Sequence, residues 1–195
     1  LEIGSLLNTE LAGNPEFSEM VAGAMEAQRK GNALEGARWL LLILAACEAA
    51  GGDWRDAAPA AAAIELFITA GDLFDDIEDR DIPSSDVPYS ANVACALLLL
   101  SEKAALRLRD GRQVGAVLHA ISGAGTRSCA GQYQDIRYEA CESVTEQAWL
   151  DMTDLRSGSL VECVCRVGAI VGTDDEERIE TYARFGRLLG IGGQI

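Results

Sequence analysis

GDLFDDIEDRD, residues 71–81, follows directly on the apolar run AAAAIELFITA at residues 60–70. Seven of its side chains carry charge, and six of the seven are acidic. At about 100° of rotation per residue, four aspartates fall on one helical stripe about 100° wide; they are Asp72, Asp75, Asp76 and Asp79. Neighbouring apolar side chains project to roughly the opposite face; they are Leu66, Ala70, Leu73, Phe74 and Ile77. The pattern predicts a long helix that is anchored in a core by one face and carries carboxylates on the other.

The carboxylate stripe conflicts with two local rules of helix stability. Like charges four residues apart cost a few tenths of a kcal/mol per pair. Anions near the C-terminal end of a helix also face the negative end of its dipole. A hard divalent cation would resolve both conflicts, because Mg²⁺ prefers carboxylate oxygens and takes further ligands from water and phosphates. Asp75, Asp76 and Asp79 are therefore candidate Mg²⁺ ligands, and a solvated acidic helix end is the alternative explanation.

The rest of the chain is expected to be helical, since Ala, Leu, Glu and Arg dominate and β-branched runs are short. Glycine- and proline-containing turn signals divide it into expected helices. These are Glu16–Lys30, Leu34–Ala50, Ala57–Arg80, Tyr89–Arg109, Gln113–Cys129, Thr145–Val171 and Asp175–Leu189. Residues 173–176, Thr-Asp-Asp-Glu, are expected to cap the last helix. With 195 residues and 49% hydrophobic composition, we expect a single all-α domain over residues 1–195.

Charge and composition exclude several classes. The net charge of −15 argues against nucleic-acid binding, which needs clustered Lys and Arg. The most apolar stretch, Trp39–Ala50, is about half the length of a membrane span and contains Glu48. No signal peptide is visible at the start, and the six cysteines are expected to be reduced and mostly buried. These features favour a cytoplasmic protein. Because the sequence does not begin with Met, we expect it to be part of a longer product.

The stretch Asp75–Asp79, DDIED, resembles the first aspartate-rich DDxxD motif of the trans-isoprenyl diphosphate synthases, the polyprenyl synthetase family. Four further segments resemble family motifs and occur in the family's order. They are Gly36-Ala37-Arg38 with the apolar helix after it, Gly131–Asp135 (GQYQD), Arg156–Leu160 (RSGSL), and the glycine-rich residues 185–195. The resemblance covers most of the chain.

The resemblance implies a helical bundle of the class I isoprenoid synthase type around a deep apolar cavity, working as a homodimer. An allylic prenyl diphosphate would sit at the mouth, with Mg²⁺ held by the catalytic Asp75, Asp76 and Asp79. Residues implied to contact the diphosphate are Arg38, Gln132, Asp135, Arg156 and Gln194. Residues implied to line the tunnel for the prenyl chain are Phe67, Ala70 and Gly71. Mg²⁺ makes diphosphate a better leaving group, and an apolar cavity shields the allylic cation from water.

The departures from the family pattern bear on the second substrate, isopentenyl diphosphate. Ala37 and Leu40 stand where the family has basic residues, and Arg80–Ser84 (RDIPS) lacks the usual Arg-Arg-Gly. The sequence is also expected to lack the family's C-terminal part, because it stops at Ile195, where the second aspartate-rich motif should begin. Alternatives to chain elongation therefore stay open. They are cyclisation of a single allylic diphosphate, prenylation of a peptide, and a catalytically silent regulatory subunit.

Overall fold

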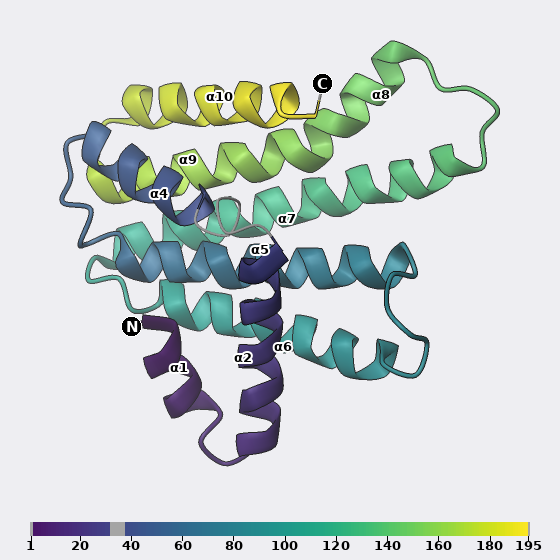
Figure 1. Cartoon of the computed structure of the whole chain (residues 1–195). Coiled ribbons are helices and arrows are strands. Elements are labelled where there is room, and N and C mark those ends of the chain that lie inside the picture. Colours follow the sequence, from purple (N-terminus) through teal and green to yellow (C-terminus); the bar gives the residue numbers. More distant parts are fainter. Residues whose placement is uncertain (1, 32–37, 195) are drawn as a thin grey trace. The chain divides into compact units, whose positions relative to one another are not determined.

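The computed structural model describes residues 2–31 and 38–194, with side chains for residues 2–27 and 39–194. Every regular element in these ranges is helical, which confirms the all-α prediction (Figure 1). The elements are α1 (Glu2–Glu10), α2 (Pro15–Gly31), α4 (Arg38–Ala49), α5 (Ala58–Glu78), α6 (Val87–Ala105), α7 (Gly111–Glu139), α8 (Glu146–Thr153), the π-helical turn η1 (Asp154–Gly158), α9 (Ser159–Gly172) and α10 (Glu176–Gly192).

Three elements differ from the sequence-based prediction. Helix α1 was not predicted. Helix α7 does not end at Cys129 but continues to Glu139, so the GQYQD segment is helical. The helix predicted for residues 145–171 is interrupted by η1, a wide turn between α8 and α9. The start of the helix predicted for Leu34–Ala50 lies outside the described residues.

Contacts divide the chain into two compact units, residues 1–41 with 55–114 and residues 42–54 with 115–195. In the first unit, α5 and α6 run antiparallel, and α1 and α2 contact both (Figure 1). The four alanines 60–63 of α5 are buried, as are Leu66 of α5 and Leu97 of α6. Small side chains let packed helices approach closely, so α5 is fixed in this core by its N-terminal two thirds. The prediction of a single domain for residues 1–195 stays a prediction.

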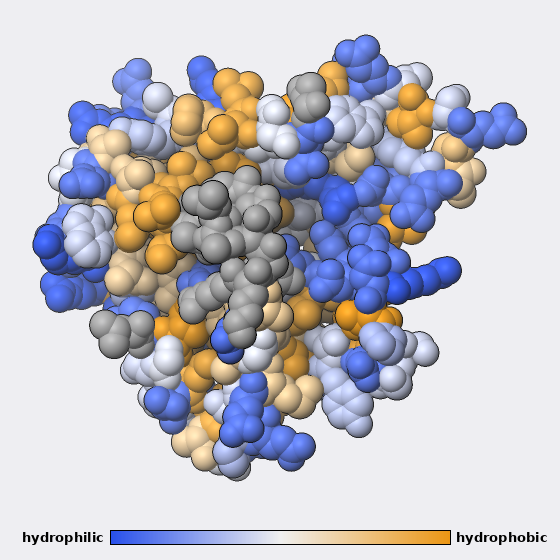
Figure 2. All heavy atoms as spheres, in the orientation of Figure 1, coloured by the Kyte–Doolittle hydropathy of each residue, from blue (hydrophilic) through white to orange (hydrophobic). Residues whose placement is uncertain are grey.

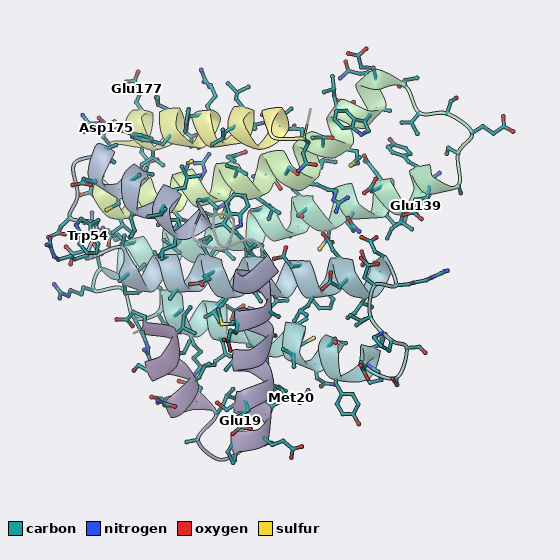
Figure 3. All side chains as sticks on the ribbon, in the orientation of Figure 1. Glu19, Met20, Trp54, Glu139, Asp175 and Glu177 are labelled. Atoms are coloured by element: carbon teal, nitrogen blue, oxygen red, sulfur yellow. The ribbon has the colours of Figure 1, made fainter. Side chains whose placement is uncertain are left out.

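Helix α9 is the centre of the second unit. Eleven of its fourteen residues are buried, and α7 and α10 run antiparallel to it (Figure 1). The larger part of α4, from Leu42 on, belongs to this unit although it is far away in the sequence. Just beyond α4, the Ala50 carbonyl accepts a hydrogen bond of 3.1 Å from the Arg178 guanidinium of α10. Asp175 caps α10 by accepting a hydrogen bond of 3.2 Å from the Arg178 amide, which confirms the capping segment predicted at residues 173–176 (Figure 3).

Two expectations about the surface are tested by the described residues. None of the described helices combines the length and the apolar character needed to cross a bilayer. The expectation of mostly buried cysteines holds for half of them. Cys47, Cys163 and Cys165 are buried, whereas Cys95, Cys129 and Cys141 are exposed because they lie on outward-facing positions of α6 and α7 or just beyond α7.

Candidate functional site

The predicted carboxylate stripe lies at the C-terminal end of α5. Asp79 is the C-cap residue, and its amide donates a hydrogen bond of 2.8 Å to the Asp75 carbonyl. Arg80 adopts a left-handed backbone conformation with φ of 63°, which ends the helix. Asp75 and Asp76 are half-buried and Asp79 is exposed. Hydrophilic side chains cover this end of α5 in the view of Figure 2. The buried part of α5 thus holds a partly solvated set of carboxylates in place.

The carboxylates of the stripe destabilise one another's charged forms. Burial raises the pKa of Asp72 to about 6, and the charges of Asp75 and Asp76 add to this effect. Burial also raises the pKa of Asp76, together with the charges of Asp81 and Asp79. Asp72 was not in the predicted ligand set, although its place on the stripe was visible from the helical period. Excess negative charge at this end of α5 is a property that a bound cation would relieve.

The structure does not gather the predicted ligands Asp75, Asp76 and Asp79 into a closed metal-binding site. Within residues 2–31 and 38–194, no three His, Cys, Asp or Glu side chains are gathered closely enough to hold a metal ion by themselves. Mg²⁺ is bound in proteins by one or two carboxylates together with water and substrate phosphates. Carboxylates along one face of a helix end, open on the other side, suit that mode of binding.

The three residues predicted to line a prenyl tunnel precede the stripe and differ in their surroundings. Ala70 is fully buried and Phe67 is half-buried. Gly71 is exposed, and a side chain added there would meet no other atom of the described residues within 4 Å. A Cβ is therefore accommodated at residue 71, whereas Ala70 is enclosed by its neighbours.

In the second unit, the structure brings together two of the residues predicted to contact diphosphate. The Arg156 guanidinium forms an ion pair with the Asp135 carboxylate, and both side chains are half-buried. Gln132, one turn before Asp135 on α7, is buried, and its carbonyl oxygen has no hydrogen-bond partner among the described residues. An orphaned buried oxygen of this kind is uncommon in folded proteins and usually accepts a bond from water or a ligand.

The two remaining residues predicted to contact diphosphate, Gln194 and Arg38, have no described contact with the pair Asp135–Arg156. Gln194 is exposed just beyond the end of α10, where its amide donates a hydrogen bond of 3.1 Å to the Ile191 carbonyl. The side chain of Arg38, like residues 36 and 37, lies outside the described residues. The carboxylates of α5 belong to one compact unit and the pair Asp135–Arg156 to the other, so the two groups are described separately.

Solved structures of isoprenoid synthases share this all-helical fold. A geranylgeranyl pyrophosphate synthetase from Pyrococcus horikoshii is 27% identical, with a TM-score of 0.77 over 100% of this chain and 65% of that chain. The geranyl diphosphate synthase small subunit from Antirrhinum majus is 23% identical, with a TM-score of 0.72 over 98% of this chain and 82% of that chain. The fold is therefore that of the isoprenoid synthases.

The family assignment follows from sequence comparison. The family model described as polyprenyl synthetase matches residues 33–195, so the chain belongs to the polyprenyl synthetase family. The geranylgeranyl diphosphate synthase of Methanosarcina mazei is 33% identical over 165 residues, which cover 80% of this chain and 51% of that protein. The short chain isoprenyl diphosphate synthase of Methanothermobacter thermautotrophicus is 31% identical over 79% of this chain and 50% of its own length. The chain spans about half the length of these curated relatives.

Proposed function

We propose that the protein is an Mg²⁺-dependent prenyltransferase that ionises an allylic prenyl diphosphate. The observation that carries the proposal is the carboxylate stripe on a buried helix, in a chain of the polyprenyl synthetase family. The raised pKa values of Asp72 and Asp76 support it, because burial, with neighbouring carboxylates as a second cause, disfavours charged forms that a bound cation would stabilise. Relatives named as prenyl diphosphate synthases support the substrate class.

The chain's own residues have separable roles in this reaction. Asp75, Asp76 and Asp79 would hold Mg²⁺, which supplies charge neutralisation for the diphosphate leaving group. Arg156, kept in place by Asp135, would contact the diphosphate as a fixed cation. Apolar side chains of α5, among them the half-buried Phe67, would present apolar surface to the prenyl chain and exclude water from an allylic cation.

Pyrophosphate binding measured by calorimetry tests the proposal, with the full-length protein, in the presence and absence of Mg²⁺. Asp75→Ala and Asp79→Ala should each weaken Mg²⁺-dependent binding at least about tenfold, a change that corresponds to about 1.4 kcal/mol. Glu78→Ala is the matched control, because Glu78 is an exposed acid at the same helix end but off the stripe. Binding that ignores Mg²⁺, or an equal effect of all three substitutions, would contradict the proposal.

A second candidate function is that of a catalytically silent subunit that pairs with an active synthase. It is favoured by Ala37 and Leu40, which stand where the family has basic residues, and by Arg80–Ser84, which lacks Arg-Arg-Gly. Turnover by the purified protein alone, with an allylic diphosphate, separates the two candidates. If the wild-type protein releases pyrophosphate and Asp75→Ala does not, the protein is an enzyme. If the wild-type protein releases no pyrophosphate at any Mg²⁺ concentration, the result supports the catalytically silent subunit.

We propose further that the protein works as a cytoplasmic homodimer. Two leucines of α6, Leu98 and Leu99, and its C-cap residue Leu106 are exposed in the single chain, which offers apolar surface for a second copy. Light scattering coupled to size-exclusion chromatography should give twice the mass of one chain. A mass of one chain at micromolar concentration would refute the dimer.

A further inference from the structure

The turn η1 interrupts the path from α8 to α9 with Arg156 at its centre. Isolated π-helical turns are rare and occur mostly at functional sites. The turn has the wide i to i−5 hydrogen bonding of a π-helix, with the Ser159 amide donating to the Asp154 carbonyl, and further contacts add to it. Within η1 and α9, the buried Ser159 hydroxyl supplies one of them by donating a hydrogen bond of 2.5 Å to the Leu155 carbonyl.

Helix α10 holds the start of η1 through an ion pair. The Arg187 guanidinium donates from Nε to Asp154 Oδ1 at 2.6 Å, and a second guanidinium nitrogen pairs with Oδ2. This two-point geometry fixes orientation as well as distance. The α10 backbone also touches η1, because a Cβ added to Gly190 would collide with the Ser157 carbonyl oxygen.

Helix α7 holds the other side of the turn. A Cβ added to Gly131 would lie 2.9 Å from the Arg156 amide nitrogen and 2.9 Å from Leu155 Cβ. One turn further along α7, Asp135 pairs with the Arg156 guanidinium. The turn that carries Arg156 is therefore packed between α7 and α10.

From this arrangement we infer that Asp154 and Arg187 are positioning residues for Arg156. Their ion pair ties the first residue of η1 to α10 and so sets the place of the Arg156 guanidinium, two residues further on. The inference rests on the proposed function, in which Arg156 contacts the diphosphate. It adds two residues that lie outside the motif set predicted from the sequence.

A matched ion pair between neighbouring helices supplies the control. Arg166 of α9 pairs with Glu180 of α10, with an Nη2–Oε2 distance of 2.9 Å. Glu180 lies about two turns before Arg187 on α10. This pair links α9 to α10 as Arg187 links η1 to α10, but it does not involve η1. Glu180→Gln therefore reports what the loss of a helix–helix ion pair does by itself.

The experiment compares Mg²⁺-dependent pyrophosphate affinity with thermal stability in the full-length protein. Arg187→Gln and Asp154→Asn should weaken pyrophosphate binding about tenfold, the low end of the effect of losing a partner that orients a binding side chain. Glu180→Gln should leave the affinity within about twofold, because neither Arg166 nor Glu180 is part of η1 and Arg166 keeps its second partner, Glu162. Arg187→Lys should restore only part of the affinity, because an ammonium group cannot reproduce the two-point geometry.

Each outcome decides the inference. A tenfold loss in Arg187→Gln and Asp154→Asn with similar melting temperatures in all three charge-removing variants supports it. A lower melting temperature with unchanged affinity would show that the pair is merely structural. An equal loss of pyrophosphate affinity in Glu180→Gln would show that removing any ion pair of α10 has this effect, and it would overturn the inference. Wild-type protein that binds no pyrophosphate with Mg²⁺ would overturn the proposed function, and this inference with it. If Asp154→Asn does not fold, Arg187→Gln against Glu180→Gln gives the same comparison.

Discussion

Replacing Gly131 by alanine should destabilise the protein, although alanine is the better helix former. The added Cβ would lie 2.7 Å from Arg156 Cγ and 2.9 Å from the Arg156 amide nitrogen, closer than real Cβ atoms approach. The backbone nitrogen cannot yield unless η1 moves, and overpacking of this kind costs about 1–3 kcal/mol. Helix propensity returns about 1 kcal/mol at most. We expect a net loss in the free energy of unfolding of up to about 2 kcal/mol after both terms.

Gly123→Ala is the matched control on the same helix. A Cβ at residue 123 would meet no other atom within 4 Å in the described part of the chain, so only the propensity term remains. We expect a gain of about 0.5–1 kcal/mol. Urea-induced unfolding followed by circular dichroism gives both values, and their difference isolates the cost of crowding η1. Equal stabilisation by both substitutions would show that η1 does not press on Gly131, and the packing described for this turn would be wrong.

Three further predictions follow from the site and the core. Isopentenyl diphosphate should be a poor substrate because Ala37 and Leu40 replace basic residues; rapid incorporation of the labelled compound onto an allylic primer would refute this. Ala70→Phe should shorten the prenyl chain that is accepted or produced and Phe67→Ala should lengthen it, because residue 70 is fully buried; chromatography showing unchanged chain lengths in folded variants would exclude a tunnel along α5. Burial raises the pKa of Cys163 to about 12, so this thiol stays protonated at pH 8 and should react with a chromogenic disulfide reagent only after unfolding. The exposed thiols should react in the folded protein, and six equally fast thiols would contradict the described burial. The exposed thiols are those of Cys95, Cys129 and Cys141.

Local sequence patterns are enough for those parts of the structure that local physics determines. The helical period by itself places Asp72 and Asp75 on one face of α5. The start of α10 is likewise visible in the sequence, since Asp175 caps it with a side chain only three residues from its partner amide. Such features depend on residues within one or two turns of each other.

Features that depend on distant partners could not be predicted in this way. The helix predicted from the sequence ended at Cys129, yet α7 continues through Gly131, where the missing side chain makes room for η1. The π-helical turn itself has no sequence signature in residues 154–158. It is held by Arg187, which lies 33 positions away from Asp154. The second half of the candidate site is therefore a product of tertiary contacts, whereas the carboxylate stripe is a product of helix geometry.

The hydrogen bond from Arg178 to the Ala50 carbonyl joins positions 128 residues apart, and it has a consequence for synthesis on the ribosome. Helix α4, with the sequence RWLLLILAACEA, emerges well before the part of the chain that covers it. At translation rates of about 5–20 residues per second, this interval lasts roughly 6–26 seconds. During that time the later part of this apolar helix lacks α9 and α10, against which it lies in the folded protein, and is open to association with other nascent chains. The yield of folded protein should therefore increase when expression is carried out at a lower temperature, or when chaperones that bind apolar segments such as α4 are supplied.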